Sequence, residues 1–163
     1  NETASERAMM RKYIVDSVAY WATEYHIDGF RFDLMGVHDL DTMKAVRKAL
    51  DQVNPDIMVY GEGWTGGESA LPAAQQATKN NIYRLDRVGA FSDDIRDGIK
   101  GSVFDFLDKG FVSGKDDMEE NIKFSVVAAT RIRRLRSQRL VISVRTGRDS
   151  RDRVLIIYPA MII

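Results

Sequence analysis

Residues 1–130 predict an α/β fold built on a parallel sheet, and three observations lead to that class. Two short apolar stretches, 29–36 and 57–64, have the length and composition of buried strands. Helical patterns lie on both sides of the first stretch and separate it from the second. Helices and strands in alternation are typical of parallel sheets, in which the chemistry gathers at the carboxyl ends of the strands.

The first stretch, 29–36, ends in a candidate catalytic acid. Strand alternation divides it into an apolar face and a second face that carries Arg31, Asp33 and Met35. Asp33 lies at the carboxyl end of the predicted strand. Arg31 is two residues earlier on the same face, where its charge and hydrogen bonds favour the ionised form of Asp33.

The second stretch, 57–64, repeats this arrangement. It is an apolar strand with Tyr60 and Glu62 on one face, and Glu62 lies between two glycines at the carboxyl end. Neighbouring parallel strands would therefore each present one carboxylate at the same edge of the sheet. Two carboxylates that face one pocket are the arrangement that glycoside hydrolysis requires.

Two helices are expected around the first strand. A capping box at residues 3–6 starts the first helix, and its apolar stripe is assigned to the core, with Trp21 as core rather than as a sugar platform. The stripe consists of Met10, Ile14, Val18, Trp21 and Tyr25. The second helix is expected over about 40–53, because Asn54 and Pro55 stop it.

Further elements are expected downstream. The pattern predicts a third strand over 83–92, with Ser92 capping a helix that runs to Lys100. The neighbouring Asp93 and Asp94 are interpreted as complements to the helix dipole rather than as a metal site. A final helix is marked by four apolar residues at helical spacing, Met118, Ile122, Val126 and Ala129.

The amino-acid sequences of these stretches resemble those of a known group of enzymes. Residues 30–33 (Phe-Arg-Phe-Asp) and 61–64 (Gly-Glu-Gly-Trp) are similar to two short conserved regions of the α-amylase superfamily, glycoside hydrolase family 13. More narrowly, residues 1–7, 25–29 and 33–36 resemble type I pullulanase. The resemblance runs from the first residue to about residue 130 and then stops.

The resemblance implies the central portion of a partial (β/α)₈ TIM barrel. It also implies a parent enzyme that hydrolyses α-1,6-glucosidic branch linkages in pullulan, amylopectin or glycogen dextrins without a cofactor or a metal. Asp33 fits the nucleophile of a retaining reaction, since Arg31 favours its charged form, and Glu62 fits the acid/base. Arg31, His38 and Trp64 are the expected substrate-binding residues. His38 is equally well explained as an ordinary loop histidine near a helix start.

One catalytic group of the resembled family is missing. There, a histidine–aspartate pair on a later strand supplies the third carboxylate, and no such pair follows Thr130 in this chain. We therefore expect a fragment of a pullulanase-like hydrolase that is inactive alone. Two alternatives stay open: a non-catalytic truncated product or carbohydrate-binding remnant, and another enzyme of the superfamily, such as a glycogen debranching enzyme.

The last part of the chain differs in composition. Up to Thr130 there are 15 Lys and Arg against 22 Asp and Glu, whereas from Arg131 onward there are 9 against 2, and all nine are Arg. This break separates residues 1–130, which the resemblance implies are a fragment of a catalytic barrel, from an unmatched Arg-rich tail over 131–163, which a frame-shifted read-through would explain. Because the first residue is Asn1 rather than Met, we interpret the chain as processed or as a piece of something longer.

Composition narrows the function classes further. The chain has no cysteine, which excludes disulfides and thiolate metal sites, and its apolar runs are too short to span a membrane. The expected partner is an α-glucan. Nucleic acid is not expected, and salt-dependent binding by the Arg-rich tail is the weaker alternative. Unpaired sheet edges favour self-association, and the compartment of the parent enzyme stays open between bacterial cytoplasm and secretion.

Overall fold

The structure is a computed structural model that describes residues 4–126. In chain order the helices and strands are α1 (Ala8–Tyr25), β1 (Gly29–Phe32), α2 (Leu40–Val53), β2 (Met58–Gly61), β3 (Gly89–Ala90), α3 (Asp93–Lys100) and α4 (Glu119–Val126). Short 3₁₀ turns lie at Met35–Val37, Ile82–Arg84 and Phe111–Ser113. Within residues 4–126 the strands form one parallel sheet in the order β1-β2-β3, which confirms the predicted class there.

Some predictions fall outside the described residues. They concern the Arg-rich tail over 131–163, Thr3 of the predicted capping box and Ala129 at the end of the last helix.

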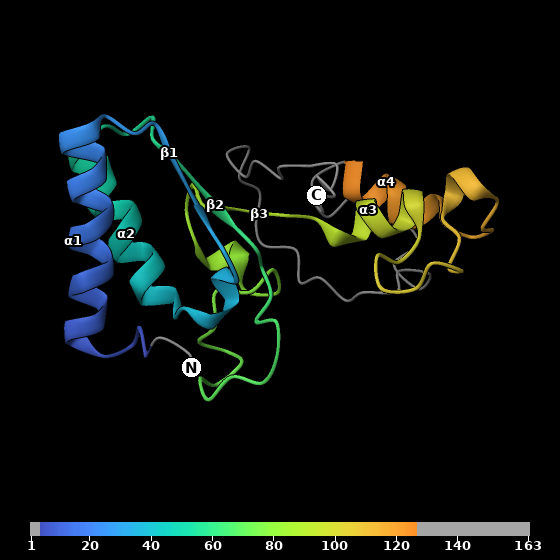
Figure 1. The fold of residues 1–163 in the computed structure, drawn as a ribbon, viewed down its shortest axis with the longest axis horizontal. Coiled ribbons are helices and arrows are strands. Elements are labelled where there is room, and N and C mark those ends of the chain that lie inside the picture. Colours follow the sequence, from blue (N-terminus) through green and yellow to red (C-terminus); the bar gives the residue numbers. More distant parts are fainter. Residues whose placement is uncertain (1–3, 127–163) are drawn as a thin grey trace.

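The helices α1 and α2 cover one face of the sheet. Figure 1 shows them side by side, with α3 and α4 beyond β3 at the other end of the molecule. Between these two helices and the sheet lies the main core, with Val18 and Ala22 of α1, Met43, Val46 and Leu50 of α2, and Ile57 and Val59 of the second strand region. The opposite face of the sheet carries Arg31 and Tyr60 in register, and it is the face on which the candidate site lies.

The helix α2 has the predicted bounds. Asp39 caps its start by accepting hydrogen bonds from the N–H groups of Asp41 and Thr42, each at 3.1 Å. At the other end the N–H of Asn54 still reaches the Leu50 carbonyl, and Pro55 follows directly. Local signals at both ends are therefore sufficient to define this helix.

The start of α1 differs from the prediction. The helix begins at Ala8, and its N-cap Arg7 makes no capping hydrogen bond with its side chain. Ser5 is fully buried and instead exchanges hydrogen bonds with Asp39, donating to Oδ1 at 2.8 Å and accepting from the N–H at 2.8 Å. The predicted helix start near residue 3 was wrong, because residues 4–7 precede the helix and this tertiary contact draws Ser5 to the start of α2.

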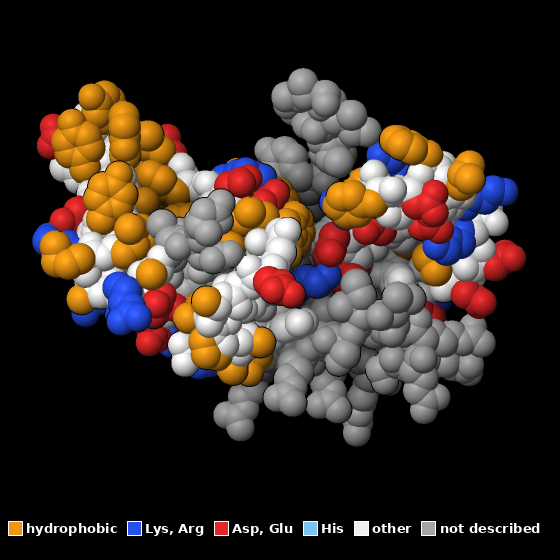
Figure 2. Space-filling model, turned by 60° about the horizontal axis from the view of Figure 1, so that its bottom comes forward, with side chains coloured by type: hydrophobic (Ala, Val, Ile, Leu, Met, Phe, Trp, Pro, Cys, Tyr) orange, Lys and Arg blue, Asp and Glu red, His pale blue; other side chains and the backbone are white. Residues whose placement is uncertain are grey.

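The aromatic end of the α1 stripe is exposed, although it was predicted to be core. Val18 is buried, but Trp21 is 43% and Tyr25 58% exposed. The helix turns the side that carries Val18 and Ala22 toward α2 and the sheet, and this leaves Trp21 and Tyr25 on a flank that nothing in residues 4–126 covers. Their rings contact each other at 4.5 Å between centroids, and Figure 2 shows hydrophobic side chains gathered over this helix.

Two strands are shorter than predicted because of left-handed residues. Leu34 has φ 43° and ψ 49°, which ends the alternation of β1 and turns Met35 into the core instead of onto the face of Arg31. Arg87 has φ 48°, and the Ile82–Arg84 turn precedes it, so β3 pairs only at Gly89–Ala90. Pattern alone does not show where a backbone leaves the extended region.

The helix α3 follows the prediction. Ser92 accepts the capping hydrogen bond from the N–H of Ile95 at 3.4 Å, and Asp93 and Asp94 occupy the first turn. The Lys79 ammonium forms ion pairs with both carboxylates. The two acids therefore face a protein cation in addition to the positive end of the helix.

A buried network joins the starts of α1 and α2 around Asp39. Its carboxylate accepts hydrogen bonds from Ser5, from Thr42 and, at 2.9 Å, from Arg11. Burial by itself raises the pKa of the Asp39 carboxyl, but the hydrogen bonds from Thr42 and Ser5 and the charge of Arg11 outweigh it and hold the pKa below its usual value.

This network predicts a loss of stability in acid. A carboxyl with a depressed folded-state pKa stabilises the fold above its unfolded pKa, and that contribution is lost as the pH falls through the folded value. We expect the melting temperature to drop below about pH 4, and Asp39→Asn to flatten that part of the curve while costing about 1–3 kcal/mol at neutral pH. Thermal unfolding followed by circular dichroism measures both effects. The control is Asp16→Asn, which removes an exposed pair with Lys12; an equal acid slope in parent and Asp39→Asn would contradict the prediction.

Candidate active site

The two predicted catalytic acids lie at the same edge of the sheet. The strands β1 and β2 pair in parallel, and their last partners are Phe32 and Gly61. Asp33 and Glu62 are the next residue of each strand, and the N–H of Glu62 continues the ladder by donating to the Phe32 carbonyl at 3.0 Å. The predicted placement of both carboxylates at neighbouring carboxyl ends is confirmed.

One guanidinium connects the two acids. Arg31 donates from Nη1 to Asp33 Oδ1 at 2.5 Å and from Nη2 to Glu62 Oε1 at 2.8 Å. The exposed fraction of the Asp33 side chain is 72%, whereas that of Glu62 is 17%. The pair thus combines one open carboxylate and one sheltered carboxylate, which is the kind of difference in environment that separates two catalytic carboxyls by role.

The left-handed turn after β1 holds Glu62 from the other side. The N–H of Leu34 donates to Glu62 Oε2 at 2.8 Å, so each oxygen of this carboxylate accepts a hydrogen bond. The N–H of Gly36 lies 3.2 Å from the Glu62 carbonyl and 3.1 Å from that of Trp64. These contacts orient the Glu62 side chain and fasten the start of the following loop to the turn.

The third strand contributes a residue that sequence reasoning missed. Phe91 follows β3 directly, as Asp33 and Glu62 follow their strands, and its N–H donates to the Gly61 carbonyl at 3.0 Å. The Arg31 guanidinium carbon lies 5.7 Å from the centre of its ring. The shared position after a strand end was the signal that could have identified Phe91.

His38 and Trp64 lie near the site but outside this cluster. The His38 ring contacts Phe32 edge-on at 5.7 Å, and burial lowers the pKa of His38 against the opposing charge of Asp39. Its Nδ1 atom is buried and has no hydrogen-bond partner in the part of the chain that the structure describes. Trp64 is half-buried and is tied down through its carbonyl. Their binding of substrate stays a prediction.

The close approach of β1 and β2 requires glycine at position 61. A Cβ atom there would lie 2.6 Å from the Phe32 carbonyl oxygen and 2.8 Å from Met35 Cβ. A backbone neighbour cannot move away without disturbing the sheet. A Cβ atom added at Gly67, in the loop after Glu62, would have no other atom within 4 Å, so Gly67 serves as a matched control.

We expect Gly61→Ala to destabilise the fold by about 2–3 kcal/mol, because the added methyl group overpacks the strand pair. Gly67→Ala should change stability by less than about 0.5 kcal/mol. Chemical denaturation of both variants measures the difference, and equal midpoints for the two would contradict the close packing assigned to Gly61.

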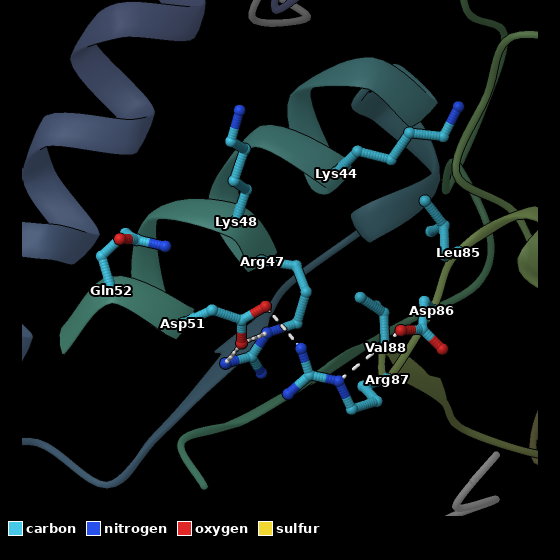
Figure 3. A pocket seen from close by; sticks show the side chains of 9 residues that line it. All are labelled: Lys44, Arg47, Lys48, Asp51, Gln52, Leu85, Asp86, Arg87 and Val88. Carbon is cyan, nitrogen blue, oxygen red and sulfur yellow. Dashed lines mark hydrogen bonds and ion pairs between the residues drawn. The ribbon is translucent and has the colours of Figure 1, made fainter. Parts of the chain in front are cut away.

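A cavity of about 250 Å³ lies away from the carboxylates, between α2 and residues 85–88. Figure 3 shows Asp51 there between the guanidinium groups of Arg47 and Arg87, with which it forms ion pairs. The cavity is lined by Lys44, Arg47, Lys48, Asp51, Gln52, Leu85, Asp86, Arg87 and Val88. It shares no lining residue with the predicted site.

Residues 4–126 contain no candidate metal centre and no candidate membrane span. No group of three or more His, Asp or Glu side chains there is placed to hold a metal ion. No helix in this part of the chain is both long enough and apolar enough to cross a membrane.

Comparison with known proteins gives the following matches. No protein-family model matches the chain. A pullulanase of Bacillus subtilis (strain 168) is 38% identical over 130 residues, which are 80% of this chain and 18% of that protein. The pullulanase of Anoxybacillus sp. LM18-11, solved with maltotetraose, has a TM-score of 0.72 at 44% identity over 76% of this chain and 18% of its own. Pullulanase type I from Bacillus subtilis str. 168, solved with maltose, has a TM-score of 0.76 at 37% identity over 81% of this chain and 18% of its own.

These matches agree in sequence and in backbone. The chain spans less than a fifth of the length of these relatives. Because each match covers more than three quarters of the chain, the resemblance extends well beyond the short motifs. The chain is homologous, over most of its length, to one segment of the type I pullulanases.

Proposed function

We propose that this chain carries the nucleophile and the acid/base of a retaining α-glucan hydrolase of the pullulanase type. One observation carries the proposal: Arg31 joins Asp33 and Glu62 at neighbouring carboxyl ends of a parallel sheet. The similarity to pullulanases solved with maltotriose and maltotetraose supports an α-glucan as the substrate. The linkage class is the α-1,6 branch bond of pullulan, amylopectin or glycogen dextrins.

In this reaction the two acids act on opposite sides of the anomeric carbon. Asp33 attacks that carbon and forms a glycosyl ester, while Glu62 donates a proton to the leaving oxygen. Glu62 then removes a proton from the water that hydrolyses the ester. Arg31 orients the nucleophile through its hydrogen bond to Asp33, and the side chains of His38 and Trp64 bind sugar at the rim.

The complete enzyme would be a (β/α)₈ barrel, of which the described sheet is the central part. A barrel of this type takes about 250 residues, and the proposed site face is the side of the sheet that α1 and α2 leave uncovered. The third carboxylate and the remaining walls of the pocket belong to other strands. The isolated chain is therefore inactive, because positioning the substrate against Asp33 and Glu62 requires those strands.

The test exchanges the matched 130 residues of the Bacillus subtilis pullulanase for those of this chain. The hybrid should release reducing sugar from pullulan, and the isolated chain should release none. A hybrid that folds and binds maltotriose but releases no sugar would refute the proposal. Turnover by the isolated chain that is lost in Asp33→Asn would show that the missing strands are dispensable.

A further inference from the structure

We propose that Phe91 is a positioning residue for the carboxylate pair and acts through Arg31. The proposal rests on the proposed function, because it concerns how the same two acids are held. Phe91 presents its ring to the guanidinium that joins Asp33 to Glu62, with the guanidinium carbon 5.7 Å from the ring centre. It brings β3 into a site that β1 and β2 otherwise form.

The guanidinium needs such support. The Arg31 side chain is 42% exposed, and its partner Asp33 is 72% exposed. Ion pairs at this exposure hold a long, flexible side chain weakly, since water screens the charges and ordering costs entropy. An aromatic ring attracts a guanidinium without competing for its N–H groups, so both hydrogen bonds to the carboxylates are kept.

The ring itself is held firmly. The N–H of Phe91 donates to the Gly61 carbonyl, so its backbone is part of the sheet ladder. Its ring meets the Tyr60 ring edge-on, at 5.6 Å between centroids and an interplanar angle of 90°. Tyr60 is also the register partner of Arg31. Arg31, Tyr60 and Phe91 therefore lie together across three strands of the sheet, and the position of Arg31 depends on the pairing of β3.

Phe91 has no titratable group and would not itself take part in the reaction. Its effect would come from the quadrupole of the ring, which Tyr reproduces and Leu of similar bulk does not. The pair Phe91→Leu and Phe91→Tyr therefore separates the attraction to Arg31 from mere filling of space.

The experiment measures how well Arg31 protects the two acids in the full chain. Carboxylates are labelled with a carbodiimide and glycine ethyl ester, and the rate at each residue is read by mass spectrometry. Phe91→Leu should raise the labelling rates of Asp33 and Glu62 about two- to fivefold, the size expected for a surface cation–π contact. Phe91→Tyr should match the parent, and Arg31→Ala sets the upper limit. Asp56, which is exposed and distant in the fold, is the internal reference.

Two results would overturn the proposal. In the first, Arg31→Ala raises labelling but Phe91→Leu does not. In the second, Phe91→Leu raises labelling at Asp56 as much as at the two acids, which indicates general loosening.

A second test, by NMR spectroscopy, uses the unaltered chain and therefore does not require any variant to fold. The guanidinium N–H protons of Arg31 should resonate upfield of those of an ordinary arginine in the NMR spectrum, because the guanidinium carbon lies over the Phe91 ring. An unshifted resonance would also overturn the proposal. Neither readout involves sugar, so an inactive hybrid would refute the proposed function without deciding the role of Phe91.

Discussion

Asp33→Asn should reduce the pullulan hydrolysis of the hybrid enzyme by about 10⁴-fold or more. The amide is nearly the same size and still accepts a hydrogen bond from Arg31, but it lacks the charge and the nucleophilic oxygen that form the glycosyl ester. Because Asp33 is open to solvent and is not part of the core, the loss should come without a loss of fold. Initial rates on pullulan, together with the melting temperature, measure both.

The matched control is Asp56→Asn, which changes an exposed acid before β2. It should leave the rate within about twofold of the parent, as ordinary surface substitutions do. Residual activity above about a tenth of the parent in Asp33→Asn would remove Asp33 from the role of nucleophile.

Glu62→Gln should reduce pullulan hydrolysis by about 10²–10⁴-fold, the usual contribution of a general acid–base group. The effect should depend on the leaving group. The leaving group of an activated aryl α-glucoside departs without a proton. Formation of the glycosyl ester should therefore survive in Glu62→Gln and give a burst of the aryl alcohol before the slow hydrolysis of the ester. Stopped-flow absorbance measures the burst.

The contrast between the two acids is the decisive comparison. Asp33→Asn should give no burst with any leaving group, since no glycosyl ester forms. Equal and mild losses in both variants, independent of the leaving group, would contradict both assignments.

The sequence determined the features of this protein that depend on local chemistry. Strand periodicity and the glycines around 61–63 were enough to place Asp33 and Glu62 at neighbouring carboxyl ends. In a parallel pair the carboxyl ends of both strands lie at the same edge of the sheet. The bounds of α2 followed from its cap and from the Asn54–Pro55 stop. The short motifs also led to the family to which the chain is homologous.

Tertiary structure decided which side chains meet. Ser5 has the chemistry of a helix cap, and only packing against Asp39 shows that it serves another helix. Trp21 fits a core stripe by spacing, but burial depends on what lies beside the helix, and helical periodicity contains no information about that neighbour.

The site itself shows the same division. The sequence placed Arg31 on the face of Asp33, but its simultaneous contact with Glu62, 31 residues further along the chain, depends on the distance between β1 and β2. Phe91 became part of the site because the third strand, predicted over 83–92, pairs at only two residues, and the pattern did not mark which ones. Periodicity describes one element at a time, whereas contacts between elements depend on distances that exist only after the sheet has formed.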